Sequence, residues 1–246
     1  MIEIPRKYQT SYFGNIDSIK PEPDTIKLFL DMFKDEGLLP STYQEIFPFK
    51  PPVTRLRLAA PDSGWRIDFD SPRIIIQKNL VDPSGENMGS IEDFIREMTT
   101  YYKRIFDRFP IKGTRLALVN SGLIREYPED ILSLIYKRVF NPIEFFQVNS
   151  PGEWKSRSVS KINIDLNGNQ ELLNIIIDLN RIPWLVPISE EAKQKDRIEI
   201  AFDINTFQGN TDTRFDMASL SAFYPEALRL RNDILVQIEG LINEQC

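Results

Sequence analysis

Three short segments of alternating apolar and polar residues, joined by brief connections, constrain the fold of this chain most strongly. They are "RLRLAA" (55–60), "WRIDFD" (65–70) and "RIIIQK" (73–78). Alternation with a period of two is typical of strands, and the intervening "PDSG" and Ser71-Pro72 are typical of turns. Strands joined this tightly must run antiparallel. The segment therefore predicts an antiparallel meander.

The elements after this meander can be expected from capping and periodicity. Ser90 followed by Asp93 is a capping signal for a long amphipathic helix. The expected elements are a helix at 90–109, a strand at 114–124, a helix at 128–140, strands near 157–167, 171–179 and 197–205, and a terminal helix from 216. Pro225 is expected to split or kink that last helix.

The order βββα, βα, β, βββα groups strands before helices, which predicts an α+β fold with an antiparallel sheet or sheets and packed helices. Its recurrence suggests a pseudo-duplication of a βββα unit, with halves at 53–125 and 150–246. Whether the halves share one sheet is left open at this stage.

Residues 1–52 are expected to form a separate N-terminal segment, in which a helix capped by Asp24 lies between irregular stretches. The proline-rich "FPFKPPV" (47–53) marks the boundary with the body, 53–246. Five aromatic residues of the irregular stretches either cover the core or anchor a partner: Tyr8, Tyr12, Phe13, Phe47 and Phe49.

Two residue counts exclude whole classes of chemistry. The chain has no histidine, which rules out Ser-His-Asp, Cys-His and His-ligated metal sites within it, and its one cysteine is the terminal Cys246. A single thiol forms no internal disulfide or thiolate zinc site. We therefore predict no cofactor and no metal site, and we lean towards a protein that is not an enzyme.

Charge and hydropathy bear on location and partners. The net charge of -6 disfavours nucleic-acid binding, although a local basic strip could override it. No signal peptide and no apolar run of about 20 residues is seen. The expectation is a cytoplasmic protein without a membrane partner.

Three Asp residues each precede Leu or Ile and then Asn at the end of an apolar strand: Asp165, Asp178 and Asp203. Asp165 and Asp178 should lie towards opposite ends of a hairpin, whereas Asp203 could lie at the end occupied by Asp165. A divalent-cation site is one interpretation. The commoner one is that Asp and Asn end strands by bonding nearby backbone.

Residues 153–161 hold the other candidates. Glu153 and Lys155 resemble part of a metal-dependent nuclease element, with Asp130 or Asp68 as a further carboxylate. Trp154, Lys155, Arg157 and Lys161 could instead contact a partner or a phosphate, with Arg157 and Lys161 on one strand face. A charged edge strand explains the same residues.

Arg231 lies near the apolar stripe of the terminal helix. A buried arginine is expected to have a carboxylate partner, either within the fold or at an interface.

The strand "AFDINTF", the strand "TRLALVN" after a long helix, and the terminal helix together resemble a sporadically distributed family of uncharacterised bacterial proteins of about this length. The resemblance covers residues 55–245. That family usually has a histidine early in its last helix, which this chain lacks. No catalytic residues are established for the family, so no residue role is transferred. The patchy distribution implied by the resemblance suits an accessory role in anti-phage defence.

The leading hypothesis is a non-enzymatic interaction subunit that docks on another protein, such as an effector ATPase or nuclease. The alternatives are a metal-dependent nuclease or phosphodiesterase, and a sensor of nucleic acid or a phosphorylated ligand.

Overall fold

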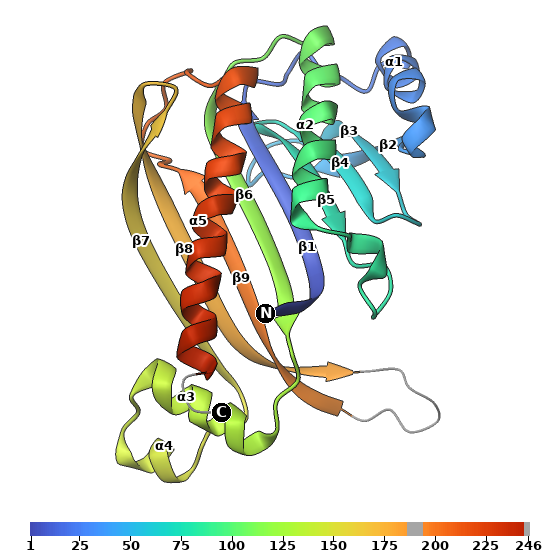
Figure 1. The fold of residues 1–246 in the computed structure, drawn as a ribbon. Coiled ribbons are helices and arrows are strands. Elements are labelled where there is room, and N and C mark those ends of the chain that lie inside the picture. The colour runs from blue at the N-terminus through green and yellow to red at the C-terminus, as the bar shows by residue number, and fades with distance from the viewer. Residues whose placement is uncertain (186–193, 244–246) are drawn as a thin grey trace.

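The computed structural model describes residues 1–185 and 194–243 (Figure 1). These residues form a nine-stranded antiparallel sheet in the order β2-β3-β4-β5-β1-β6-β9-β8-β7. Two long helices, α2 (Ile91–Arg108) and α5 (Met217–Asn243), lie across one face (Figure 1). The α+β class is confirmed, and both predicted halves contribute to the same sheet.

Two three-stranded meanders form where the sequence predicts them. The first comprises β3 (Val53–Ala60), β4 (Trp65–Asp70) and β5 (Arg73–Asn79). The second comprises β7 (Trp154–Leu166), β8 (Asn169–Leu185) and β9 (Gln194–Thr206). Along the chain, the two meanders are separated by α2, β6 (Gly113–Ile124) and α3 (Glu129–Phe140).

The N-terminal segment is not irregular as predicted. β1 (Ile2–Gly14) pairs with β5 on one side and β6 on the other, at the centre of the sheet. Its buried positions include Tyr8 and Tyr12, so these aromatics are core residues and not partner anchors. A register shift next to Pro5 absorbs the proline, and the mixture of Lys, Gln, Thr and Tyr hides the alternation in the sequence.

The rest of that segment also joins the body. α1 (Pro23–Phe33) is followed by a 3₁₀ turn (Lys34–Glu36) and by β2 (Leu39–Glu45), an edge strand paired with β3. Phe29 of α1 packs on Phe69 of β4, with ring centroids 4.9 Å apart.

The suggested duplication is visible in the topology, with a longer unit. Each half consists of a strand, a helical segment, a meander and a long helix, over 2–108 and 113–243. β1 and β6, the first strands of the two halves, pair antiparallel at the centre. β2 is an addition to the first half.

One further expectation is wrong, and the expected effect of Pro225 is wrong as far as a split of the helix is concerned. The lone strand expected between 140 and 157 is a short helix, α4 (Glu144–Val148). α5 is not split at Pro225 and begins after Asp216, whose carboxylate accepts a hydrogen bond of 2.9 Å from the Ser219 amide. None of the described helices has the length and apolarity needed to cross a membrane.

Candidate functional site

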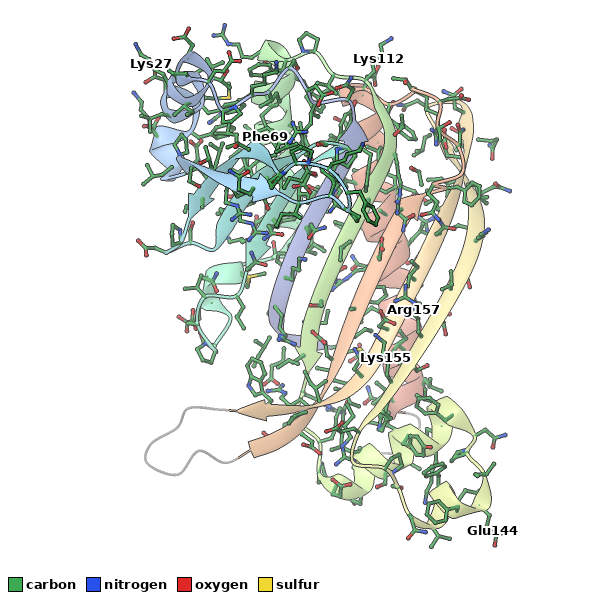
Figure 2. The ribbon with its side chains drawn as sticks, turned by 180° about the vertical axis from the view of Figure 1, so that it is seen from behind. Lys27, Phe69, Lys112, Glu144, Lys155 and Arg157 are labelled. Atoms are coloured by element: carbon green, nitrogen blue, oxygen red, sulfur yellow. The ribbon has the colours of Figure 1, made fainter. Side chains whose placement is uncertain are left out.

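The sequence-predicted basic residues lie on the face of the sheet opposite the helices (Figure 2). β7 forms one edge of the sheet, and its odd-numbered residues face this helix-free side. Lys155, Arg157 and Lys161 are exposed there, which confirms that Arg157 and Lys161 share one strand face.

Neighbouring groups already contact these cations. Arg157 Nη1 lies 2.8 Å from Asp178 Oδ2, and Lys155 Nζ lies 3.8 Å from Asp178 Oδ1. Lys161 Nζ lies 4.7 Å from the centroid of the Phe207 ring. The strip is therefore partly neutralised, and a charged edge strand accounts for much of its composition.

Trp154 points away from this strip. It is buried against α3, with ring centroids 5.6 Å from Phe140 and 6.2 Å from Tyr136. Its indole therefore attaches α3 to the start of β7 and is not exposed to a partner.

A shallow surface depression of about 380 Å³ lies beside Trp154. Its lining residues are Glu153, Trp154, Lys155, Asn180, Arg181 and Ile182. The guanidinium of Arg181 is held by Glu129 Oε2 and Asp196 Oδ2, both 2.6 Å from Nη2. Burial by itself would lower the pKa of Arg181, but these two carboxylates raise it. The arginine is thus already paired and is not a free anion site.

The predicted carboxylates do not converge. In the register of β7 and β8, Asp165 lies opposite Gln170 and Asp178 lies opposite Arg157. Arg157 and Asp165 are eight residues apart along β7, which corresponds to about 26 Å at about 3.3 Å per residue. The Asp165 carboxylate accepts a 2.7 Å hydrogen bond from the Gly168 amide, as expected for a turn residue.

Asp203 lies opposite Ile176, which pairs with Val159. This places it two residues from the level of Arg157 and six from that of Asp165, so its expected position beside Asp165 is wrong. Asp203 faces away from the buried apolar residues of β9, because Phe202 and Ile204 are buried whereas Asp203 is partly exposed.

The nuclease alternative requires carboxylates near Glu153 and Lys155. Asp68 lies on β4, six strands from β7, or about 29 Å at about 4.8 Å per strand, and it pairs with Arg57 and Arg66. Asp130 lies in the first turn of α3 and does not line the depression. Within residues 1–185 and 194–243, no three acidic or cysteine side chains form a metal-binding group.

Arg231 differs from the prediction as well. It is buried, yet no carboxylate lies within ion-pair distance of it in the described part of the chain. Its Nη1 donates to the neighbouring Asn232 Oδ1 at 2.6 Å, and its Nε has no hydrogen-bond partner.

An exposed apolar patch is the feature that the sequence reading missed. It consists of Ile143 (70% exposed), Phe145 (63%), Phe146 (37%) and Val148 (77%), in and beside α4. We call these four residues the α4 patch. α3 and α4 form a small helical unit beyond the C-terminal end of α5, and Glu144 marks its outer side (Figures 1 and 2). The apolar residues of "PIEFFQV" are the sequence signal for this patch. A strand is expected at this position, and the apolar side chains of a strand are normally assigned to the core.

α3, the helix that precedes the α4 patch, is attached to the body. Arg138 of α3 donates hydrogen bonds from Nη1 to the carbonyl oxygens of Leu241 (3.1 Å) and Ile242 (2.9 Å) at the end of α5. Tyr136 and Phe140 pack on Trp154. An apolar, exposed surface such as the α4 patch is typical of a protein-binding site.

A search of protein-family models finds no match to this chain. A comparison with curated proteins finds no relative either.

Proposed function

We propose that this protein is a non-enzymatic interaction subunit that docks on another protein through the α4 patch. The observation that carries the proposal is the exposure of four large apolar side chains within six consecutive residues. Exposed apolar groups gain free energy when a partner removes them from water, at about 25 cal/mol per Å². Aromatic side chains such as Phe145 are frequent energetic centres of interfaces.

The residue arrangement supports this function over the two alternatives. A metal-dependent nuclease needs carboxylates that meet, and the candidate carboxylates are separated along and across the sheet. A phosphate sensor based on Arg157 needs a free guanidinium, and this guanidinium is paired with Asp178.

The setting that we propose is a bacterial multi-protein system in the cytoplasm. The resemblance to a sporadically distributed bacterial family suggests anti-phage defence, with an effector ATPase or nuclease as the partner. The single cysteine is consistent with a reducing compartment.

A native pull-down from the organism that encodes the protein tests the proposal, with the mass of the intact complex measured. We expect a stoichiometric protein partner to be recovered by the natural chain. The variant Phe145→Asp/Val148→Asp should bind that partner at least about tenfold more weakly, because charge replaces the apolar centre of the interface.

A matched control carries two Asp substitutions at exposed apolar positions elsewhere, Val81→Asp/Val236→Asp. It should retain the partner. Undiminished binding by the α4 variant would exclude the patch as the docking site. Recovery of the natural chain as a monomer or homodimer would contradict the subunit hypothesis itself.

A further inference from the structure

A row of buried residues crosses the centre of the sheet on its helix-free face. α2 and α5 lie on the other side of the sheet (Figures 1 and 2). Strand register places these residues in one line, Asp68, Ile75, Ser11, Ala117 and Asn205, on β4, β5, β1, β6 and β9. All five are buried. Since no described helix covers them, longer side chains from adjacent rows must do so.

Four long cationic side chains lie on the rows to either side of this line, with Arg66, Arg73 and Arg115 on adjacent rows and Lys7 one row further out. The Phe13 ring lies between two of them, with its centroid 5.5 Å from Arg73 Cζ and 4.7 Å from Arg115 Cζ. Arg66 on β4 lies in the row of Gln77 and Gln9, and Lys7 on β1 lies in the next row, opposite Asn79. Burial and the nearby positive charges of Arg66 and Arg73 lower the pKa of Lys7.

The carboxylates on this part of the face are too few to neutralise the cations. Arg57 and Arg66 share Asp68, at 2.5 Å and 2.8 Å, and Arg73 pairs with Asp70 at 3.1 Å.

Two of these cations have no ion-pair partner in the described part of the chain. Lys7 and Arg115 have no carboxylate within 4.0 Å among residues 1–185 and 194–243, and Arg115 Nε is buried without a hydrogen-bond partner. Burial and the charge of Arg73 lower the pKa of Arg115, against the opposing influence of Asp203. A chain with a net charge of -6 thus concentrates unneutralised positive charge at the centre of this face.

We propose that this cationic cluster, Lys7, Arg66, Arg73 and Arg115, binds the phosphate groups of a single-stranded nucleic acid through Lys7 and Arg115, because Arg66 and Arg73 are already paired with Asp68 and Asp70. Guanidinium groups pair well with phosphate oxygens, and an oxyanion would satisfy the unpaired donors of Arg115. Phe13 is partly exposed beside the cations, as is Phe207, which lies under Lys161 at the far side of the sheet. Cations alternating with aromatic rings on an open surface suit an unpaired strand, whose bases can stack.

The span of the surface fits such a ligand. Arg73 on β5 and Lys161 on β7 are separated by five strand spacings, or about 24 Å. A sheet face carries no protruding helix or ribbon to enter a duplex groove, so an unpaired strand is the better fit. The proposed site is independent of the α4 patch.

Fluorescence anisotropy with a labelled oligothymidylate of about 12 nucleotides tests the proposal. The variant Lys7→Gln/Arg115→Gln should bind at least about tenfold more weakly than the natural chain. Removing two phosphate contacts should also reduce the slope of log affinity against log salt by about 1.4, at about 0.7 per contact for single strands.

The control variant Lys103→Gln/Arg229→Gln removes two exposed cations from α2 and α5 and should bind normally. Circular dichroism should show that both variants are folded. Neither Lys7 nor Arg115 leaves a paired carboxylate behind, and Arg229 leaves Glu226 and Asp233 in exposed pairs along α5, which contribute little to stability. A folded Lys7→Gln/Arg115→Gln variant that keeps the natural affinity and salt slope would overturn the site.

Competitors distinguish the ligand class. Unlabelled oligothymidylate should displace the probe, whereas polyglutamate and duplex DNA should do so much less well. Equal displacement by polyglutamate would overturn the nucleic-acid assignment in favour of an acidic protein segment. Binding of pyrophosphate without any binding of the oligonucleotide would overturn it in favour of a small phosphorylated ligand.

Discussion

At the scale of residues, two buried arginines in this protein occupy opposite electrostatic situations. Arg181 is held by Glu129 and Asp196 in charged hydrogen bonds of 2.6 Å. Arg231 has no carboxylate partner in the described residues, and burial lowers its pKa. A paired charge and an unpaired charge of similar burial should respond differently to the same substitution.

We therefore expect Arg181→Met to lower the free energy of unfolding by about 1 to 3 kcal/mol, since it removes charged hydrogen bonds and leaves two carboxylates behind. Glu129 is largely exposed, which keeps the loss moderate. Arg231→Met should lower the free energy of unfolding by less than about 1 kcal/mol, or should raise it. Urea unfolding of both variants measures this, and an equal loss in both would show that Arg231 has a stabilising partner.

At the scale of elements, β1 shows how a strand of mixed composition can hold a sheet together. It pairs along most of its length with β5 and β6, and it joins the two halves of the fold. Its Tyr12 hydroxyl lies 2.6 Å from the Phe215 carbonyl oxygen and 3.0 Å from that of Ile111. β1 therefore contributes both backbone pairing and a buried contact next to the start of α5.

A chain limited to residues 53–246 is expected not to fold. Removing β1 would expose the inner edges of β5 and β6 and separate the two halves of the core. Circular dichroism during thermal unfolding should show no cooperative transition, in contrast to the full chain. A cooperative transition in the shortened chain would instead support an independent domain that begins at residue 53.

At the scale of the whole molecule, the helix-covered face buries a set of phenolic groups. Burial raises the pKa of Tyr8 from 10.0 to about 12, and it also raises the pKa values of Tyr12, Tyr101, Tyr102 and Tyr224. In the unfolded chain these tyrosines would titrate near 10. The folded state therefore binds protons more tightly than the unfolded state in alkaline solution.

Stability should consequently fall as the pH rises above about 10. The stabilisation is fully present below the unfolded pKa and is lost as the pH rises through the folded pKa values, the first of them about 12 for Tyr8. The urea concentration at the unfolding midpoint should fall steeply from about pH 9.5 to 11.5. Phenolate absorbance should appear over about the same pH range, because the tyrosines ionise as the chain unfolds. Phenolate absorbance that develops fully near pH 10 in a folded chain would contradict the burial of these groups.

Much of the fold could be predicted from local patterns. The two meanders, α2 and α3 follow from alternation, helical spacing and the Ser90 cap. The exposed positions of Arg157 and Lys161 also follow from alternation within one strand. β1 could not be recognised in this way, because its few apolar residues acquire their alternation only from the strands on either side. The α4 patch was missed because its exposure depends on where α3 ends and where the unit docks.

The sequence by itself thus determined the class of the fold and the exclusion of histidine and thiolate chemistry, because strand period, turn residues and residue counts are local properties. Only the tertiary structure decided which residues meet. Lys7, Arg66, Arg73 and Arg115 are separated by up to about a hundred positions along the chain, and pairing of β4, β5, β1 and β6 brings them to one face. Pairing partners and register depend on contacts across the whole sheet, and those contacts place the cationic cluster where no segment alone could show it.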